Sequence, residues 1–123
     1  MKSQKRYNLK KKRKCREADK LWQQAIFKKY GEFCEVCGKP SGPPHHFVPK
    51  SLSAALRYDL KNGVPLCTGC HFAHHHKSDP EIHARIIEKR GQKWYNYLQE
   101  HRRDSVITSL AYFEDKIKKL SGR

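Results

Sequence analysis

Residues 34–76 read CEVCGKPSGPPHHFVPKSLSAALRYDLKNGVPLCTGCHFAHHH. Two CxxC pairs, Cys34 with Cys37 and Cys67 with Cys70, lie near the ends of this stretch, so four thiolates can share one tetrahedral zinc ion. Four thiolates leave no open position on the metal, which is typical of a structural site. Because a small chain buries little apolar surface, the zinc would also supply folding free energy. We therefore predict a zinc-stapled core.

A second group of metal-ligating side chains lies within and after this stretch. His71 and His75 are four residues apart, so on a helix they share one face and can hold one ion. His74 is an alternative to His75 as the ligand. His45 and His46 are neighbours on a predicted strand, so their side chains point to opposite faces. One of them can bind a metal while the other stays free to act as a general base.

The charge of the chain restricts its partners. The 123 residues carry 27 Lys+Arg against 12 Asp+Glu, a net charge of +15. This excess favours a polyanion, and nucleic acid is preferred to a membrane because no lipidation signal or interfacial helix is present. No transmembrane helix is expected, since no run of about 18 apolar residues occurs. No secretory signal is expected either, since the basic N-terminus has no apolar h-region. The odd number of cysteines, 5 in all, indicates a reducing compartment, with Cys15 as a free thiol.

The N-terminal segment is a block of one charge sign. Residues 1–14 contain eight Lys or Arg and no acidic residue, and such a block repels itself. We expect a disordered basic tail over residues 1–16 that lies along a phosphate backbone when bound, with a merely solvated tail as the alternative. The predicted nucleic-acid contacts are Lys10, Lys11, Lys12, Arg13, Lys14 and Arg57.

Helical patterns flank the core on both sides. Residues 17–30 place apolar side chains at helical spacing, and the Gly31 that follows suits the C′ position. After the core, Asp79-Pro80 is typical of a helix start, with Asp79 as N-cap. Gly91 predicts a stop or kink before a second helix over residues 92–102.

Strands and domains complete the predicted organisation. Short strands are expected over residues 33–36 and 45–48. The apolar stripe over residues 106–120 is too short for a coiled coil, so we expect it to pack on its own domain rather than form a dimer. The predicted divisions are a tail over residues 1–16, a core with its N-terminal helix over 17–78, and a helical extension over 79–123.

In their order and spacing, the two CxxC pairs, His45-His46, Asn62 and the helical histidines resemble the HNH (ββα-metal) endonuclease family with four-cysteine zinc knuckles. The similarity covers residues 34–76. Residues 57–67 and the following Cys70-His71-Phe72 are also similar to phage recombination endonucleases of the NinG type. The resemblance implies an α+β fold, in which a small zinc-stapled ββα-metal core is flanked by N- and C-terminal helices.

The resemblance also implies a role for each matching residue. His46 would be the general base that activates water, and Asn62 would hold the loop that orients this base. His45 would be a catalytic metal ligand, completed by His71 and His75. The structural zinc would be held by Cys34, Cys37, Cys67 and Cys70. Family members with Asp in place of His45 favour Mg²⁺, whereas an all-imidazole set also suits Mn²⁺, Ni²⁺ or Zn²⁺, so the catalytic ion stays open.

The resulting prediction is a metal-dependent DNA endonuclease that hydrolyses phosphodiester bonds, with recombination intermediates as the favoured substrate. The resemblance implies the cytoplasm of a bacterium or a phage-infected host cell. Three alternatives stay open: a homing or restriction-type HNH nuclease, a non-catalytic zinc module that binds nucleic acid, and a basic interaction protein. The predicted partner is DNA, no membrane is involved, and monomer and homodimer are both compatible with the sequence.

Overall fold

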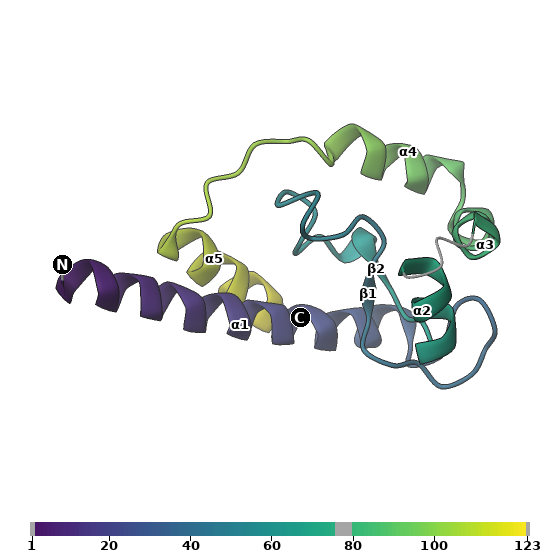
Figure 1. Cartoon of the computed structure of the whole chain (residues 1–123), viewed down its shortest axis with the longest axis horizontal. Coiled ribbons are helices and arrows are strands. Elements are labelled where there is room, and N and C mark those ends of the chain that lie inside the picture. The colour runs from purple at the N-terminus through teal and green to yellow at the C-terminus, as the bar shows by residue number, and fades with distance from the viewer. Residues whose placement is uncertain (1, 76–79, 123) are drawn as a thin grey trace.

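A two-stranded antiparallel sheet lies at the centre of the protein (Figure 1). The computed structural model describes residues 2–75 and 80–122, except the side chain of His75. Strand β1 (His45–His46) pairs with strand β2 (Gly63–Val64). The register places His45 opposite Val64 and His46 opposite Gly63.

Helices follow and surround this sheet. A 3₁₀ helix over Leu60–Asn62, with Asp59 as its N-cap, leads into β2, and α2 (Thr68–His75) follows β2. The order strand, strand, helix is that of the predicted ββα unit, and the α+β class is confirmed. The remaining helices of the described residues are α1 (Lys2–Tyr30), α3 (Pro80–Arg90), α4 (Gln92–His101) and α5 (Leu110–Ser121).

Helix α1 runs along the length of the molecule and differs from the expected tail (Figure 1). A disordered segment is expected over residues 1–16, but the helix begins at Lys2 and includes them from there. Residues 2–30 contain neither Gly nor Pro, and Lys, Arg, Gln and Leu are good helix formers. Helix propensity therefore outweighs repulsion between the basic side chains. The predicted end at Gly31 is confirmed, since this glycine has a φ of 88°.

One face of α1 packs directly on the sheet. Trp22 and Ile26 are buried in a cluster that also contains Tyr58 and Leu60. Strand β2 approaches this face so closely that a Cβ atom on Gly63 would lie 2.1 Å from Ile26 Cδ1. Only glycine therefore fits at this point of the strand.

The C-terminal helices cover two parts of the molecule. Helices α3 and α4 bury Ile86 and Leu98 in a second apolar cluster beside the sheet, and Gly91, with a φ of 98°, makes the predicted break between them. Helix α5 packs along α1 and buries Phe113 and Leu120. The predicted packing of the apolar stripe on its own domain is confirmed for these two residues, while the proposed N-cap Asp79 lies outside the described residues.

Among the described helices, none combines the length and the apolar character needed to cross a membrane.

The strand pairing differs from the expectation. The predicted strand over residues 33–36 is instead a turn, and Phe33 makes only an isolated bridge with Pro40. A CxxC pair must turn back on itself for both sulfur atoms to face one point, which is incompatible with an extended strand. The partner of β1 is therefore β2, a strand of two residues followed by Pro65, which is too short to show an alternating pattern.

Asn62 joins the end of β1 to the loop that follows it. This side chain is fully buried, and its Oδ1 accepts a hydrogen bond of 2.8 Å from the backbone N–H of Val48. Its Nδ2 donates to the carbonyl oxygens of Val48 at 3.0 Å and Leu56 at 3.2 Å. The amide thus satisfies three backbone groups of a loop that has no regular ladder of its own.

We expect Asn62→Ala to lower the free energy of unfolding by about 3 kcal/mol, because it leaves buried backbone groups without partners. Urea denaturation followed by circular dichroism measures this change. Asn96→Ala is the matched control, since Asn96 is exposed and its Oδ1 accepts a hydrogen bond from the exposed Gln92, and its effect should stay within about 0.5 kcal/mol. Equal effects of the two substitutions would contradict the anchoring role of Asn62.

Candidate functional site

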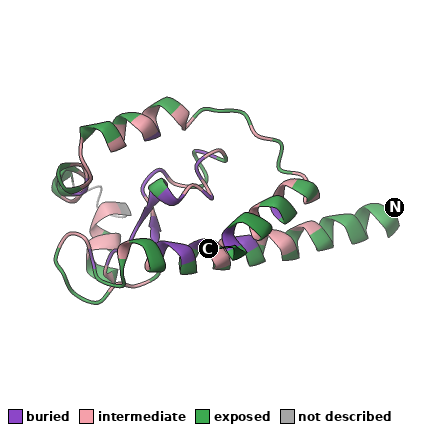
Figure 2. Cartoon of the chain, turned by 180° about the vertical axis from the view of Figure 1, so that it is seen from behind, coloured by how far each residue is buried: buried purple, intermediate pink, exposed green. Residues whose placement is uncertain are grey.

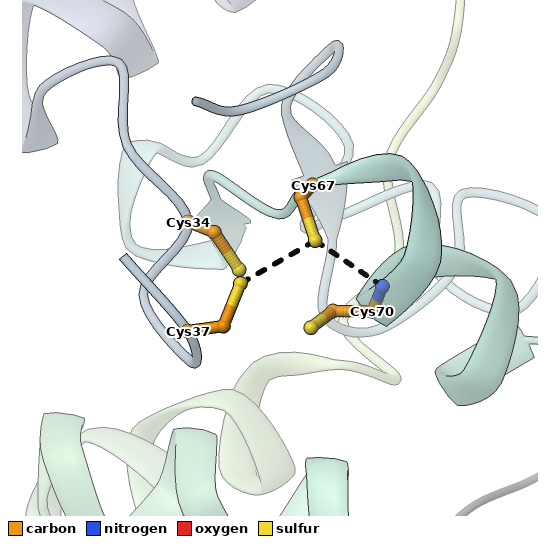
Figure 3. A group of neighbouring side chains, drawn as sticks. All are labelled: Cys34, Cys37, Cys67 and Cys70. Carbon is orange, nitrogen blue, oxygen red and sulfur yellow. Dashed lines mark hydrogen bonds between the residues drawn. The ribbon is translucent and has the colours of Figure 1, made fainter. Parts of the chain in front are cut away.

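Two tight turns bring the four cysteines together (Figure 3). Cys34 and Cys37 lie on the turn after Phe33, while Cys67 and Cys70 lie at the start of α2. All four sulfur atoms lie within 4.8 Å of one another. In a tetrahedral site with Zn–S bonds of about 2.3 Å, the sulfur atoms are about 3.8 Å apart. The cluster therefore fits one structural zinc ion.

The electrostatics of the cysteine cluster also favour a bound cation. Burial opposes ionisation of Cys34, but hydrogen bonds from the backbone N–H groups of Cys67, Cys37 and Val36 lower the pKa of its thiol to about 7. Burial and the neighbouring sulfur atoms of Cys67 and Cys34 raise the pKa of Cys70. Four thiolates at this spacing repel one another, and a bound Zn²⁺ would offset that repulsion.

An ion pair ties the C-terminal extension to the first cysteine turn. Arg90, in the last turn of α3, donates to Glu35 between Cys34 and Cys37, with Nε to Oε2 at 2.8 Å. Both side chains are nearly buried, with 10% and 7% of their surface exposed. The same guanidinium donates to the carbonyl oxygen of Gly63 in β2 at 2.8 Å and lies 3.8 Å from the centre of the Tyr30 ring. The cysteine turn, the sheet and α3 are thus connected through one side chain.

A cavity of about 530 Å³ opens beside the sheet, and three of the predicted site residues line it. These are His45 and His46 from β1 and His71 from α2. The remaining lining comes from Gln23, Pro43, Pro44, Pro49, Lys50 and Ser51. We call this cavity the histidine cleft.

The ring of His46 is held on two sides. It stacks on the ring of Trp22 with 3.9 Å between centroids and an interplanar angle of 4°. Its Nε2 lies 2.9 Å from the carbonyl oxygen of Arg57. A carbonyl only accepts, so Nε2 carries the hydrogen and Nδ1 keeps its lone pair. Burial lowers the pKa of His46 to about 4, so the ring is neutral near pH 7 and able to accept a proton.

The side chain of Arg57 has a partner within the protein. Its Nη2 donates to Asp19 Oδ2 at 2.7 Å, and its Nε donates to Oδ1 at 3.0 Å. This hydrogen-bonded carboxylate on α1 raises the pKa of the guanidinium. Arg57 therefore contributes its carbonyl to His46 and its side chain to α1, and the expected contact with nucleic acid stays a prediction.

Sequence reasoning missed the two α1 residues that support this site. Asp19 and Trp22 are three residues apart and so lie on one helix face. Trp22 also donates from Nε1 to the carbonyl oxygen of Asp59 at 3.1 Å. Spacing alone indicates that Trp22 is buried, but its contact with His46 depends on tertiary packing.

The histidines of α2 and α3 form a chain that begins at β1. His45 is buried, and its Nε2 lies 3.2 Å from His74 Nδ1. His74 Nε2 in turn lies 3.3 Å from His83 Nδ1. His83, to which the sequence assigned no role, therefore belongs to this histidine group. The centroids of the His45 and His71 rings are 4.7 Å apart.

Among the described residues, only the four cysteines bring three or more ligating atoms together, and the histidines provide one pair at ligand spacing. Two nitrogen atoms bonded to one zinc ion at 2.0–2.1 Å in tetrahedral geometry lie about 3.3 Å apart. The distance of 3.2 Å between His45 and His74 agrees with such a ligand pair. The side chain of His75 and the whole of His76 lie outside the described residues, so the role of His75 as third ligand stays a prediction.

The predicted nucleic-acid contacts of the tail all lie on α1. Residues 10–14 span little more than one turn, so their side chains spread around the helix. Lys10, Lys12 and Arg13 are exposed, whereas Lys11 and Lys14 are half-buried. The five side chains therefore do not all share one surface, although Lys10, Lys12 and Arg13 line one cavity on α1.

Residues 34–77 match the family model described as HNH endonuclease. The match includes both cysteine pairs, both strands and α2, and it contains every lining residue of the histidine cleft except Gln23 of α1. This segment is therefore similar to an HNH endonuclease domain, and the similarity supports a nuclease-type function with nucleic acid as the substrate. A comparison with curated proteins found no match, and a comparison with solved structures found none either.

We expect the purified protein to contain one zinc ion per chain, and Cys70→Ser to lose it together with cooperative unfolding, because the ion loses a ligand. Elemental analysis and thermal melts followed by circular dichroism measure both properties. Cys15→Ser is the matched control, since Cys15 is a free thiol outside the cluster, and it should keep its zinc. A Cys70→Ser protein with full zinc content and an unchanged melt would show that the cluster does not hold the ion.

Proposed function

We propose that this protein is a metal-dependent DNA endonuclease that hydrolyses phosphodiester bonds in the histidine cleft. One observation supports it above all: His46, with a lone pair on Nδ1, lines the same cavity as His45 and His71 within the segment that matches the HNH endonuclease family. A zinc module that only binds nucleic acid has no use for this second set of metal-ligating side chains.

In the proposed reaction, His46 acts as the general base. Its Nδ1 removes a proton from water while the water oxygen attacks the phosphorus atom, and the bond from phosphorus to the 3′-oxygen breaks. The leaving oxygen takes a proton from solvent, which gives a 3′-hydroxyl and a 5′-phosphate. During proton transfer, the ring keeps its hydrogen bond from Nε2 to Arg57 and its stacking contact with Trp22. Both contacts hold the ring in one orientation, so little rearrangement is needed.

His45 and His71 would hold the catalytic ion, with His74 or His75 as the third ligand. When bound, a divalent metal stabilises negative charge on the phosphate and on the leaving oxygen. The imidazole set suits Mn²⁺, Ni²⁺ or Zn²⁺, and Mg²⁺ stays among the candidates because of the family resemblance. Asn62 acts as a positioning residue, since it fixes the loop that follows β1.

The similarity of residues 57–67 to NinG-type enzymes favours recombination intermediates as the substrate. A homing or restriction-type nuclease of the same family would instead prefer a specific duplex site. Both would share the chemistry at His46, so a comparison of branched and linear substrates separates them.

We expect the wild-type protein to nick supercoiled plasmid only with a divalent metal. His46→Ala should nick it more slowly by a factor of about 100 or more, because the general base is lost. Gel electrophoresis after incubation with Mg²⁺, Mn²⁺, Ni²⁺ or Zn²⁺ measures the rates. His101→Ala is the matched control, since His101 is outside the histidine cleft and pairs with Asp104. Its rate should equal that of the wild type.

Two outcomes would contradict the proposal. Cleavage by His46→Ala at the rate of the wild type would contradict the role of His46 as the general base. Binding without cleavage by the wild type, on plasmid and on branched DNA with every metal, would favour the non-catalytic zinc module.

A further inference from the structure

A row of side chains leads out of the histidine cleft along α1. Lys5, Lys12, Arg16 and Gln23 are separated by seven, four and seven residues, a spacing that keeps them on one face of a helix. Gln23 lines the histidine cleft. The three basic residues are exposed, and we call them the basic track.

The basic track faces away from the helix that packs on α1. Helix α5 meets the face of α1 that carries Leu21 and Ala25, which line a small cavity together with Leu120. Lys14 lies seven residues before Leu21 and so shares that face, and it is half-buried. Figure 2 shows that the N-terminal half of α1 is otherwise mostly exposed.

Neighbouring basic side chains widen the track. A shallow surface cavity of about 560 Å³ on α1 is lined by Arg6, Leu9, Lys10, Lys12, Arg13 and Arg16. Two members of the track, Lys12 and Arg16, belong to this lining. No acidic residue occurs over residues 1–16, and Glu17 pairs with Lys14 at 3.7 Å rather than with a member of the track. Guanidinium and ammonium groups in such a row suit a chain of phosphates.

We propose that the basic track binds the phosphate backbone of the DNA on one side of the cleaved bond. This inference rests on the proposed endonuclease function, because it identifies which part of the substrate leaves the cleft along α1. At a rise of 1.5 Å per residue, Arg16 and Lys12 lie about 10 and 16 Å from Gln23 along the helix, and Lys5 lies about 27 Å away. With 3.4 Å per base pair, the distance of about 27 Å from Gln23 to Lys5 corresponds to about eight base pairs of flanking duplex.

The test compares two double substitutions that remove the same charge from the same part of α1. Lys12→Gln with Arg16→Gln changes the track, whereas Lys11→Gln with Lys14→Gln changes the face toward α5. Each lost phosphate contact lowers the slope of log binding constant against log salt concentration by about 0.9. We therefore expect a loss of about 1.8 in the track variant and less than half of that in the control.

Binding is measured by fluorescence anisotropy with a 30-base-pair duplex, in the zinc-loaded full chain carrying His46→Ala so that no DNA is cut. Equal slopes for the two double variants would overturn the basic track, because the helix would then act only through its total charge. A track variant with the unaltered slope would overturn it as well. Circular dichroism melts of both variants confirm that α1 is intact.

A cleavage map separates this inference from the proposed function. On end-labelled linear duplexes, the wild type should need about eight base pairs of duplex on one side of the cleaved bond, either 5′ or 3′ of it, and should therefore not cut closer than that to the corresponding end. The track variant should cut closer to that end. Uniform cutting up to both ends would overturn the basic track while supporting the endonuclease. Wild-type protein that binds with the expected slope but cuts no DNA would overturn the endonuclease function instead.

Discussion

The convergence of four cysteine sulfur atoms is the constraint on which the rest of this structure depends. It closes the chain between Cys37 and Cys67 into a loop that carries both strands, His45-His46 and Asn62. Each strand of the sheet in this loop is two residues long, so the sheet is too small to be stable alone. The cysteine cluster at one end, the buried amide of Asn62, the face of α1 and the apolar cluster that the loop shares with α3 and α4 together stabilise it.

Helix α1 joins two segments that the sequence presents as separate. Its C-terminal half places Trp22 against His46 and Asp19 against Arg57, whose carbonyl holds the same ring. Its N-terminal half carries the basic residues. Because both halves belong to one unbroken helix, a contact made by the basic half has a rigid connection to the proposed base. The extension after the HNH segment is joined just as firmly, through Arg90 and Glu35.

The parts of the site that sequence predicts are those in which spacing alone fixes the chemistry. A CxxC pair can be interpreted without a fold, and the cysteine cluster confirms that interpretation. The pairing of His71 with His75 stays a prediction, because the histidine cleft contains His71 while the side chain of His75 lies outside the described residues. The stacking of Trp22 on His46 and the chain from His45 to His83 could not be predicted, because they join elements through packing. The helical state of residues 2–16 differs from the predicted disorder for another reason: the absence of Gly and Pro favours the helix more than repulsion between like charges opposes it.

Because α1 is unbroken, its length determines the direction in which its basic side chains point. Every residue inserted or deleted between Arg16 and Trp22 turns the N-terminal half by about 100° about the helix axis and moves it by about 1.5 Å. A single-residue change would therefore point the same basic side chains at a different side of the molecule while leaving composition and charge nearly unaltered. Seven residues would restore the direction to within about 20° but shift the row by about 10 Å. The number of residues in this interval thus sets the angle about the helix axis between the basic track and the histidine cleft.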